Sequence, residues 1–299
     1  MAKLKPDAIA QADLLEYLNN HSDFSFEIEI LNTLTGIGFA CEHGGSYKDP
    51  VTKKTREFDI RATKIFGKSF LRLAVECKNL RENFPLLISC VPRRDDESFH
   101  EICISVNPDE HLLEQPPQTC SRAMLQQSKN IRLTGDRTFY KLGESVGKSC
   151  DQVGRNRNGE ILANDSQVYE KWSQALSSAD DLTYLACRDG NDRTGDLALS
   201  LVFPVMVVPN GRLWVTQYDA DGNRIADPVQ TDRCSYFVNL EYYHRGALAG
   251  DEYNISHLEF VTQDGLLQFV DDIAGDDTKL ADSFPAEHVL QVVAEQMGT

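Results

Sequence analysis

The chain lacks the long apolar segment that a membrane-spanning helix requires. Its longest apolar run, residues 197–209, is interrupted by Pro204 and is shorter than the roughly 20 residues needed to cross a bilayer. The first residues include Lys3 and Lys5 but no apolar signal segment, so we expect no export. The sequence therefore predicts a cytoplasmic protein with no membrane partner.

Paired metal-binding cysteines are also absent from the sequence. The eight cysteines are dispersed, with no Cys-x-x-Cys pair and no Cys/His spacing typical of a zinc site. The seven histidines form no His-x-x-x-His arrangement. We expect reduced and mostly buried thiols.

Basic side chains are in deficit overall, but their distribution is uneven. With 30 Lys and Arg against 46 Asp and Glu, the formal net charge is −16. Residues 201–299 hold 16 acidic and 5 basic residues (net −11), whereas residues 46–157 hold 15 acidic and 20 basic residues (net +5). A polyanionic partner would therefore contact the second of these regions.

The most informative residues lie in two alternating segments, 56–60 and 71–79. A Phe-Gly-Lys sequence between them is typical of a hairpin turn, so we predict adjacent antiparallel strands. Counting back from that turn, Asp59 and Glu76 are opposed, and opposed residues have Cβ atoms about 4.5–5.5 Å apart. Two carboxylates at this spacing can share one Mg²⁺. Lys78 faces the same way as Glu76 and would lie beside the cation.

These residue types suit the hydrolysis of a phosphodiester. The reaction needs an activated water and stabilisation of the charge that grows on the phosphate, and a lysine beside the metal can serve either need. The competing interpretation is a solvated sheet face with ordinary alternating charges. Arg61 and Arg72 share this face and could pair with the acids.

The order Asp59, Glu76-Cys77-Lys78 resembles the PD-(D/E)XK motif of the restriction-endonuclease-like nucleases, in particular the Mrr-type enzymes. Phe58 stands where the motif has proline. The resemblance implies that Asp59, Glu76 and the carbonyl of Cys77 hold Mg²⁺, for which Mn²⁺ can substitute, and that Lys78 positions the attacking water. It also implies a DNA endonuclease of bacterial restriction or phage defence, acting as a homodimer or with a regulatory or defence partner protein.

The family also places a helix before the hairpin, often with an acidic residue that reaches the metal. Residues 24–38 have the apolar spacing of a helix, with Glu27 inside the edge of the apolar face and Glu29 well outside it. Phe26-Glu27 precedes Gly38-Phe39 much as a similar pair does in Mrr-type enzymes. We predict that Glu27 helps to bind or orient the metal, with a helix-surface glutamate as the alternative.

Nucleic-acid contacts are expected from the basic region. Their targets would be phosphates, which fix the position of a strand without reading its sequence. The same side chains are also compatible with a solvated charged surface. The candidates are Lys53, Lys54, Arg56, Arg93, Arg94, Lys148, Arg155 and Arg157.

We predict one α/β domain over residues 1–299, with a restriction-endonuclease-like mixed sheet flanked by helices. Its core comprises residues of about 20–80 and 165–210. The helix and strand that the family places directly after Lys78 are expected only in the second of these segments. Residues 80–165 are then a long insertion with strands of its own and a mobile stretch near its end. Residues 210–299 form a C-terminal antiparallel, β-rich extension.

Helical spacing is also found outside the motif. Residues 7–19 and 168–186 predict helices, and the continuous apolar run 201–208 predicts a buried strand. Closing helices are expected near 266–273 and 286–297.

A second motif, from Cys187 to Gly195, resembles the Cys-x5-Arg phosphate loop of cysteine-dependent phosphatases, with Cys187 as nucleophile and Arg193 as phosphate ligand. That loop follows a buried strand, whereas the helical pattern here continues to Ala186. The thiolate would then lie at the negative end of a helix dipole, which disfavours it. The phosphatase is one alternative to the nuclease, and a catalytically silent, nuclease-like subunit for DNA binding or assembly is the other.

Overall fold

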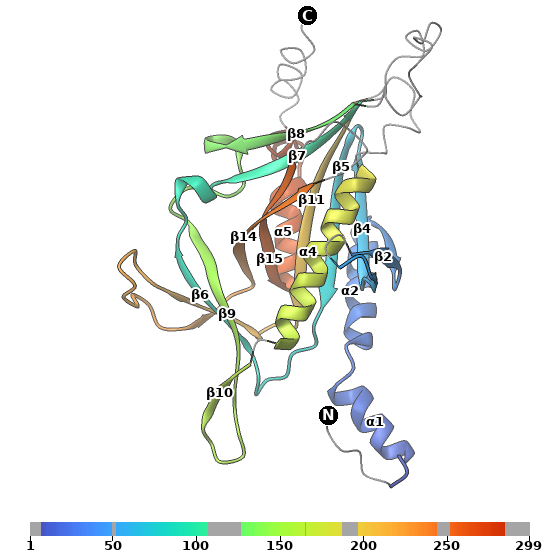
Figure 1. Cartoon of the computed structure of the whole chain (residues 1–299), viewed down its shortest axis with the longest axis vertical. Coiled ribbons are helices and arrows are strands. Elements are labelled where there is room, and N and C mark those ends of the chain that lie inside the picture. Colours follow the sequence, from blue (N-terminus) through green and yellow to red (C-terminus); the bar gives the residue numbers. More distant parts are fainter. Residues whose placement is uncertain are drawn as a thin grey trace, which may run out of the picture.

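One strongly curved mixed sheet dominates the structure, a computed structural model (Figure 1). It describes residues 7–49, 52–106, 127–164, 166–186, 197–243 and 252–284. Within these ranges thirteen strands join the sheet, and β2 and β3 pair separately. The strands are β1 Ala40–His43, β2 Ser46–Lys48, β3 Thr55–Glu57, β4 Ile60–Phe66, β5 Ser69–Cys77, β6 Leu86–Pro92, β7 Phe99–Val106, β8 Gln127–Thr134, β9 Ser145–Arg155, β10 Ile161–Ala163, β11 Leu197–Val208, β12 Leu213–Gln217, β13 Val229–Gln230, β14 Arg233–Tyr243 and β15 Glu252–Thr262.

Helices cover both faces of the sheet (Figure 1). One apolar core lies between the sheet and α2 with α5, and a second lies between the sheet and α4. None of the helices in the described part has the length and apolarity that a membrane crossing requires. The helices are α1 Gln11–Asn20, α2 Phe24–Gly36, α4 Ser166–Ala186, α5 Gln263–Ala274 and α6 Asp277–Ser283, with short 3₁₀ turns at Asp95–Glu97 and Gly135–Arg137.

The predicted motif hairpin is confirmed. β4 and β5 are antiparallel, with Phe66 opposite Ser69 and Ile60 opposite Val75. Gly67 in the turn has φ +61°, a conformation that favours glycine. In an antiparallel pair, one step back on β4 corresponds to one step forward on β5. The next opposed pair after Ile60 and Val75 is therefore Asp59 and Glu76, as predicted from the sequence.

The elements expected around the hairpin are present in the predicted order. α2 precedes the hairpin and packs Phe26, Ile30 and Leu34 into the first core. β1 pairs antiparallel with β4. After the long intervening segment, α4 leads to β11, which runs parallel to β5 and beside it. The mixed α/β class with a helix-flanked mixed sheet is therefore confirmed.

The segments on either side of residue 210 contribute to the same sheet. The strand order is β1-β4-β5-β11-β15-β14-β9-β6-β12-β13, so β15 from the C-terminal part lies at the centre, parallel to β11. β6 and β9 from residues 80–165 continue the sheet beyond β14.

Two sequence predictions within these segments have different outcomes. The stretch expected to be mobile, around residues 154–157, belongs to a hairpin in which β9 pairs with β10. α5 confirms the helix predicted at 266–273. The helix predicted at 286–297 and the motif from Cys187 to Gly195 lie outside the described residues.

Candidate functional site

Asp59 and Glu76 lie side by side at the start of β4 and the end of β5. The main-chain N–H of Asp59 donates to Oε1 of Glu76 at 3.4 Å, and the N–H of Cys77 donates to Oδ2 of Asp59 at 2.8 Å. The latter bond turns the Asp59 carboxylate along β5 toward its neighbour. The opposition of the two acids predicted from the sequence is present in the structure.

A third residue, Lys171 of α4, joins these carboxylates. Its Nζ lies 2.9 Å from Oδ1 and 2.6 Å from Oδ2 of Asp59, and 3.3 Å from Oε2 of Glu76. Sequence reasoning did not identify Lys171, which is 95 residues from Glu76. Three carboxylate oxygens thus surround one positive charge.

Burial disfavours the ionised form of the two acids. The side chain of Glu76 is only 1% exposed. Burial and the nearby charge of Asp59 raise the pKa of Glu76 well above its usual value, against the opposing effect of Lys171. Burial also acts to lower the pKa of Lys171, but Glu76 and Asp59 together raise it above its usual value. The ammonium is therefore held in its charged form by the two acids.

Glu27 approaches the same cluster from the first turn of α2. Its pKa is raised, first by burial and then by the charge of Asp59, while Lys171 and His43 lower it. His43, at the end of β1, places Nε2 at 3.4 Å from Oε2 of Glu27. The structure thus brings Glu27 within electrostatic range of Asp59, and His43 is a further neighbour that sequence reasoning did not identify.

Lys78 lies at the rim of the cluster and pairs with a different acid. Its Nζ is 2.8 Å from Oδ2 of Asp23, the residue that precedes α2. The N–H of Asn79 donates to the other oxygen of Asp23 at 2.9 Å. The ammonium of Lys78 is directed to Asp23, so its predicted place beside the cation stays a prediction.

The side chain and the main chain of Cys77 lie in different environments. Its side chain is fully buried in the core beneath α2 and α5, where burial raises the pKa of the thiol well above its usual value. Its main chain lies beside the carboxylates, as the N–H bond to Asp59 shows. Only the main chain of Cys77 can contribute to the site.

Arg61 and Arg72, the basis of the competing interpretation, are both nearly buried. Arg61 forms an ion pair with Asp181 of α4 at 2.8 Å and stacks over the Phe58 ring. Arg72 donates from Nε to the hydroxyl of Ser200 at 3.4 Å. This sheet face is covered by α4, so it is not the solvated surface that the competing interpretation required.

The donor set suits a hard divalent cation. Mg²⁺ takes oxygen ligands and is usually held by one or two carboxylates together with waters and substrate phosphate. Asp59 and Glu76 direct three oxygens at one point, which the ammonium of Lys171 takes. Across the described ranges, no three His, Cys, Asp or Glu side chains are already gathered as a metal site. Asp59 and Glu76 supply two carboxylates, the number with which Mg²⁺ is usually held.

The predicted phosphate contacts fall in two places. Lys53 and Lys54 are exposed in the loop between β2 and β3, and Arg56 on β3 is partly exposed. Arg155 and Arg157 are exposed at the β9–β10 hairpin. All five are accessible from solvent.

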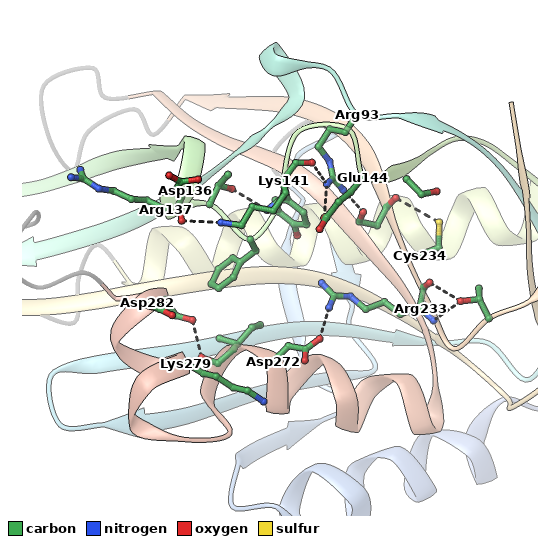
Figure 2. Close-up of a pocket in the computed structure, with 18 of the residues that line it drawn as sticks. Arg93, Asp136, Arg137, Lys141, Glu144, Arg233, Cys234, Asp272, Lys279 and Asp282 are labelled. Atoms are coloured by element: carbon green, nitrogen blue, oxygen red, sulfur yellow. Dashed lines mark hydrogen bonds and ion pairs between the residues drawn. The ribbon is translucent and has the colours of Figure 1, made fainter. Parts of the chain in front are cut away.

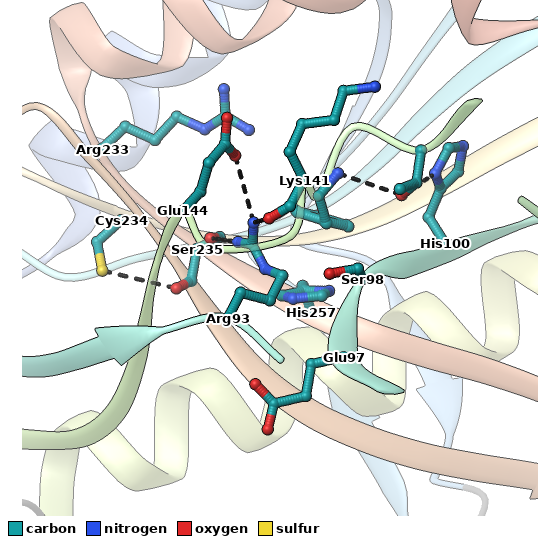
Figure 3. Close-up of polar contacts among 12 residues, drawn as sticks. Arg93, Glu97, Ser98, His100, Lys141, Glu144, Arg233, Cys234, Ser235 and His257 are labelled. Atoms are coloured by element: carbon teal, nitrogen blue, oxygen red, sulfur yellow. Dashed lines mark hydrogen bonds and ion pairs between the residues drawn. The ribbon is translucent and has the colours of Figure 1, made fainter. Parts of the chain in front are cut away.

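The predicted phosphate contact is wrong for Arg93. It is only 2% exposed and donates to the carbonyl of Lys141 at 3.0 Å, to Glu144 at 3.3 Å and to Ser235 at 2.6 Å (Figure 3). A buried arginine with these partners holds the fold together and does not meet a phosphate at the surface. Sequence reasoning could not distinguish it from its neighbour Arg94, which is exposed.

A second polar region surrounds Arg93. A cavity of about 710 Å³ lies between β14, α5, α6 and the segment before β9 (Figure 2). Two of its cations are tied to acids, since Arg233 bonds Asp272 at 3.1 Å and Lys279 bonds Asp271 at 2.6 Å. Arg233 also pairs with the buried Glu259 at 2.7 Å, but its second acid, Asp272, is 62% exposed, whereas Asp59 of the first cluster is 14% exposed.

Comparison of the chain with protein-family models, with curated proteins and with solved structures finds no match in any of the three. The cluster of Asp59, Glu76, Lys171 and Glu27 is therefore assigned a role from its geometry and chemistry.

Proposed function

We propose that the protein is a divalent-metal-dependent endonuclease of DNA, built on a restriction-endonuclease-like core formed by α2, β1, β4, β5, α4 and β11. The order of these elements and the parallel pairing of β11 with β5 support the fold assignment. The resemblance of Asp59, Glu76-Cys77-Lys78 to the PD-(D/E)XK motif supports the reaction. By the same resemblance its role is in bacterial restriction or phage defence.

The observation that carries this proposal is the convergence of the Asp59 and Glu76 carboxylates on a single cation. Buried acids that share one charge are costly to the fold, because burial penalises each ionised group. Such an arrangement is typical of sites that bind a cation for function. The third acid, Glu27, increases the negative potential at the same place.

The chain's own residues have distinct tasks in the proposed reaction. Asp59, Glu76 and the carbonyl of Cys77 would hold Mg²⁺ or Mn²⁺, with Glu27 assisting. When bound, the cation supplies an activated water and neutralises charge on the phosphate. Lys78 orients the water and stabilises the growing charge on the phosphate, and Asp23 keeps its ammonium at the rim of the site until substrate arrives.

Plasmid cleavage tests the proposal. Wild-type protein with Mg²⁺ or Mn²⁺ should convert supercoiled DNA to nicked or linear forms, and EDTA should stop the reaction. Asp59→Asn and Glu76→Gln should lower the rate by at least about 1,000-fold, because losing a metal ligand removes several kcal/mol of transition-state stabilisation. Lys78→Ala should lower it by about 100- to 10,000-fold, the usual range for a group that assists proton transfer.

Glu57→Gln is the matched control, since Glu57 is an exposed acid on the neighbouring strand β3. It should cleave at the wild-type rate. Equal rates for Asp59→Asn, Glu76→Gln and wild type would show that the cluster is not the active site. Wild-type protein that binds DNA but cleaves none would identify the silent subunit instead.

A further inference from the structure

A second cavity opens beside Lys78, between the loop that follows β5 and the β9–β10 hairpin. This cavity, the hairpin groove, has a volume of about 640 Å³. Its walls include Lys78, Arg81 and Phe84 on one side and Gly154 and Arg155 on the other. Pockets of roughly 300–1,000 Å³ hold small organic ligands, so the groove can take one or two nucleotides but not a duplex.

The hairpin groove is lined by basic residues, although the whole protein is acidic. Three of the described residues that line it are Lys or Arg, and none of them is Asp or Glu. The chain carries 46 acidic residues against 30 basic ones. Arg155 bonds through Nη1 to the carbonyl of Gly159 at 2.9 Å, a neutral partner. Because Lys78 is paired with Asp23, the attraction of the groove for an anion comes from its arginines.

The floor of the hairpin groove is aromatic. A Cβ added to Gly154 would meet the Phe84 ring at 2.5 Å, so the ring packs closely on the main chain of β9. Gln152 donates to the carbonyl of Phe84 at 3.1 Å and fixes the loop from the same strand. Phe84 remains partly exposed and lines the groove. The ring is thus held in position against Gly154 while part of its surface faces the cavity.

We propose that the hairpin groove binds a single-stranded segment of nucleic acid that leads to the proposed nuclease site. A basic channel with an aromatic platform is the combination by which proteins bind unpaired strands. Arg81 and Arg155 contact phosphates, and Phe84 stacks on a base. Lys78 belongs to both the groove and the site, so the inference rests on the proposed function and narrows its substrate to DNA with an unpaired segment.

This assignment gives Arg155 and Arg157, both predicted from the sequence to contact phosphates, different roles. Arg155 lines the hairpin groove, whereas Arg157 lies on the same hairpin but not among the lining residues. Both are exposed. Arg157 is therefore a matched control for Arg155.

Binding without cleavage tests the groove. The probe is a labelled single-stranded DNA oligonucleotide of mixed sequence, and its duplex form, followed by fluorescence anisotropy over a salt series with Ca²⁺ in place of Mg²⁺. Wild-type protein should bind the single strand more tightly than the duplex. Arg155→Ala should reduce the slope of log K against log salt by about 0.7, the contribution of one phosphate contact to a single strand. Arg157→Ala should leave the slope unchanged.

Phe84→Leu keeps an apolar side chain and removes the aromatic face. It should weaken single-strand binding by about 5- to 100-fold, the range expected for loss of one base stack. Thermal unfolding at the wild-type temperature would show that the variant is folded.

Tighter binding of the duplex, or equal salt slopes for Arg155→Ala and Arg157→Ala, would overturn the proposal. So would wild-type affinity of a folded Phe84→Leu variant. The expected binding pattern in a wild-type protein that cleaves neither plasmid nor a duplex with an unpaired segment would support the groove and contradict the proposed function, so the two can fail separately.

Discussion

Two buried glutamates on either side of β11 have opposite environments. Glu76 of β5 lies opposite Met206, and Glu259 of β15 lies opposite Val205. Because Val205 and Met206 are adjacent and belong to different cores, the two glutamates face opposite sides of the sheet. The side chains are 1% and 0% exposed.

Glu259 is closely bonded on both oxygens. Its Oε1 accepts from the hydroxyl of Tyr140 at 2.8 Å and its Oε2 from Nε of Arg233 at 2.7 Å. Arg233 lines the cavity near Arg93 and is labelled in Figures 2 and 3. Glu76, by contrast, has contacts of 3.3 and 3.4 Å and shares Lys171 with a second nearly buried acid, Asp59.

We propose that this difference distinguishes a structural charge from a functional one. Glu259 accepts two short hydrogen bonds, and the other acid on Arg233, Asp272, is exposed to solvent, so the arginine neutralises Glu259 within the fold. Two carboxylates that share one lysine leave negative charge in excess, and this excess can bind a divalent cation. We propose that an excess of buried acids over cations, rather than burial alone, marks such a site.

Removal of the cation from each region is expected to have the largest effect. Lys171→Met and Arg233→Met each leave a buried glutamate without its partner, which typically costs about 3–5 kcal/mol of unfolding free energy. Added Mn²⁺ should restore much of the loss in Lys171→Met, because the metal replaces the ammonium between Asp59 and Glu76. It should not restore Arg233→Met.

Urea unfolding with and without Mn²⁺ measures both variants. The same metal response in Lys171→Met and Arg233→Met would remove the distinction between the two regions.

Replacing Glu76 or Glu259 by glutamine should change the free energy of unfolding less than removal of the cations does, and in opposite directions. The pKa of Glu76 is raised above its ordinary value of 4.5, so ionisation of this group opposes folding. That cost is absent below about pH 4.5 and grows as the pH rises toward the folded-state pKa. Glu76→Gln should therefore stabilise the metal-free protein at neutral pH, by roughly 0.5–2 kcal/mol, and have no effect near pH 4.

Glu259→Gln should destabilise the protein at neutral pH, because Arg233 loses its charged partner. Thermal unfolding of both variants from pH 4 to 8 provides the comparison. A Glu76→Gln variant less stable than wild type at neutral pH without metal would contradict the account.

Local geometry made part of this site predictable from the sequence. A hairpin with a glycine in its turn fixes the register of the flanking strands, so the opposition of Asp59 and Glu76 follows from counting residues. The same counting on α2 identified Glu27, which lies at the edge of an apolar face.

Lys171 could have been found by the same test. At about 100° per residue it lies roughly 20° from the direction of Leu182, a buried residue of α4. A lysine at the edge of an apolar helix face requires a partner, as a glutamate does. The partners themselves could not be predicted, because they depend on how α4 packs across β5.

The remaining features depend on contacts between distant segments. The central position of β15, and the burial of Arg93 against Ser235 of β14, arise from strand pairings between residues far apart in the chain. Sequence periodicity identifies strands but not their neighbours. The prediction of a surface role for Arg93 was wrong for this reason.

Metal binding in the absence of DNA tests the central claim most directly. Isothermal titration of Mn²⁺ into wild-type protein should give a saturable site, and Glu76→Gln should weaken it by at least about 100-fold, since it removes a ligand rather than a supporting residue. Glu259→Gln, the equally buried glutamate across β11, should bind Mn²⁺ as wild type does. Wild-type affinity in Glu76→Gln, or no binding by any of the three proteins, would contradict the assignment of Asp59 and Glu76 as a metal site.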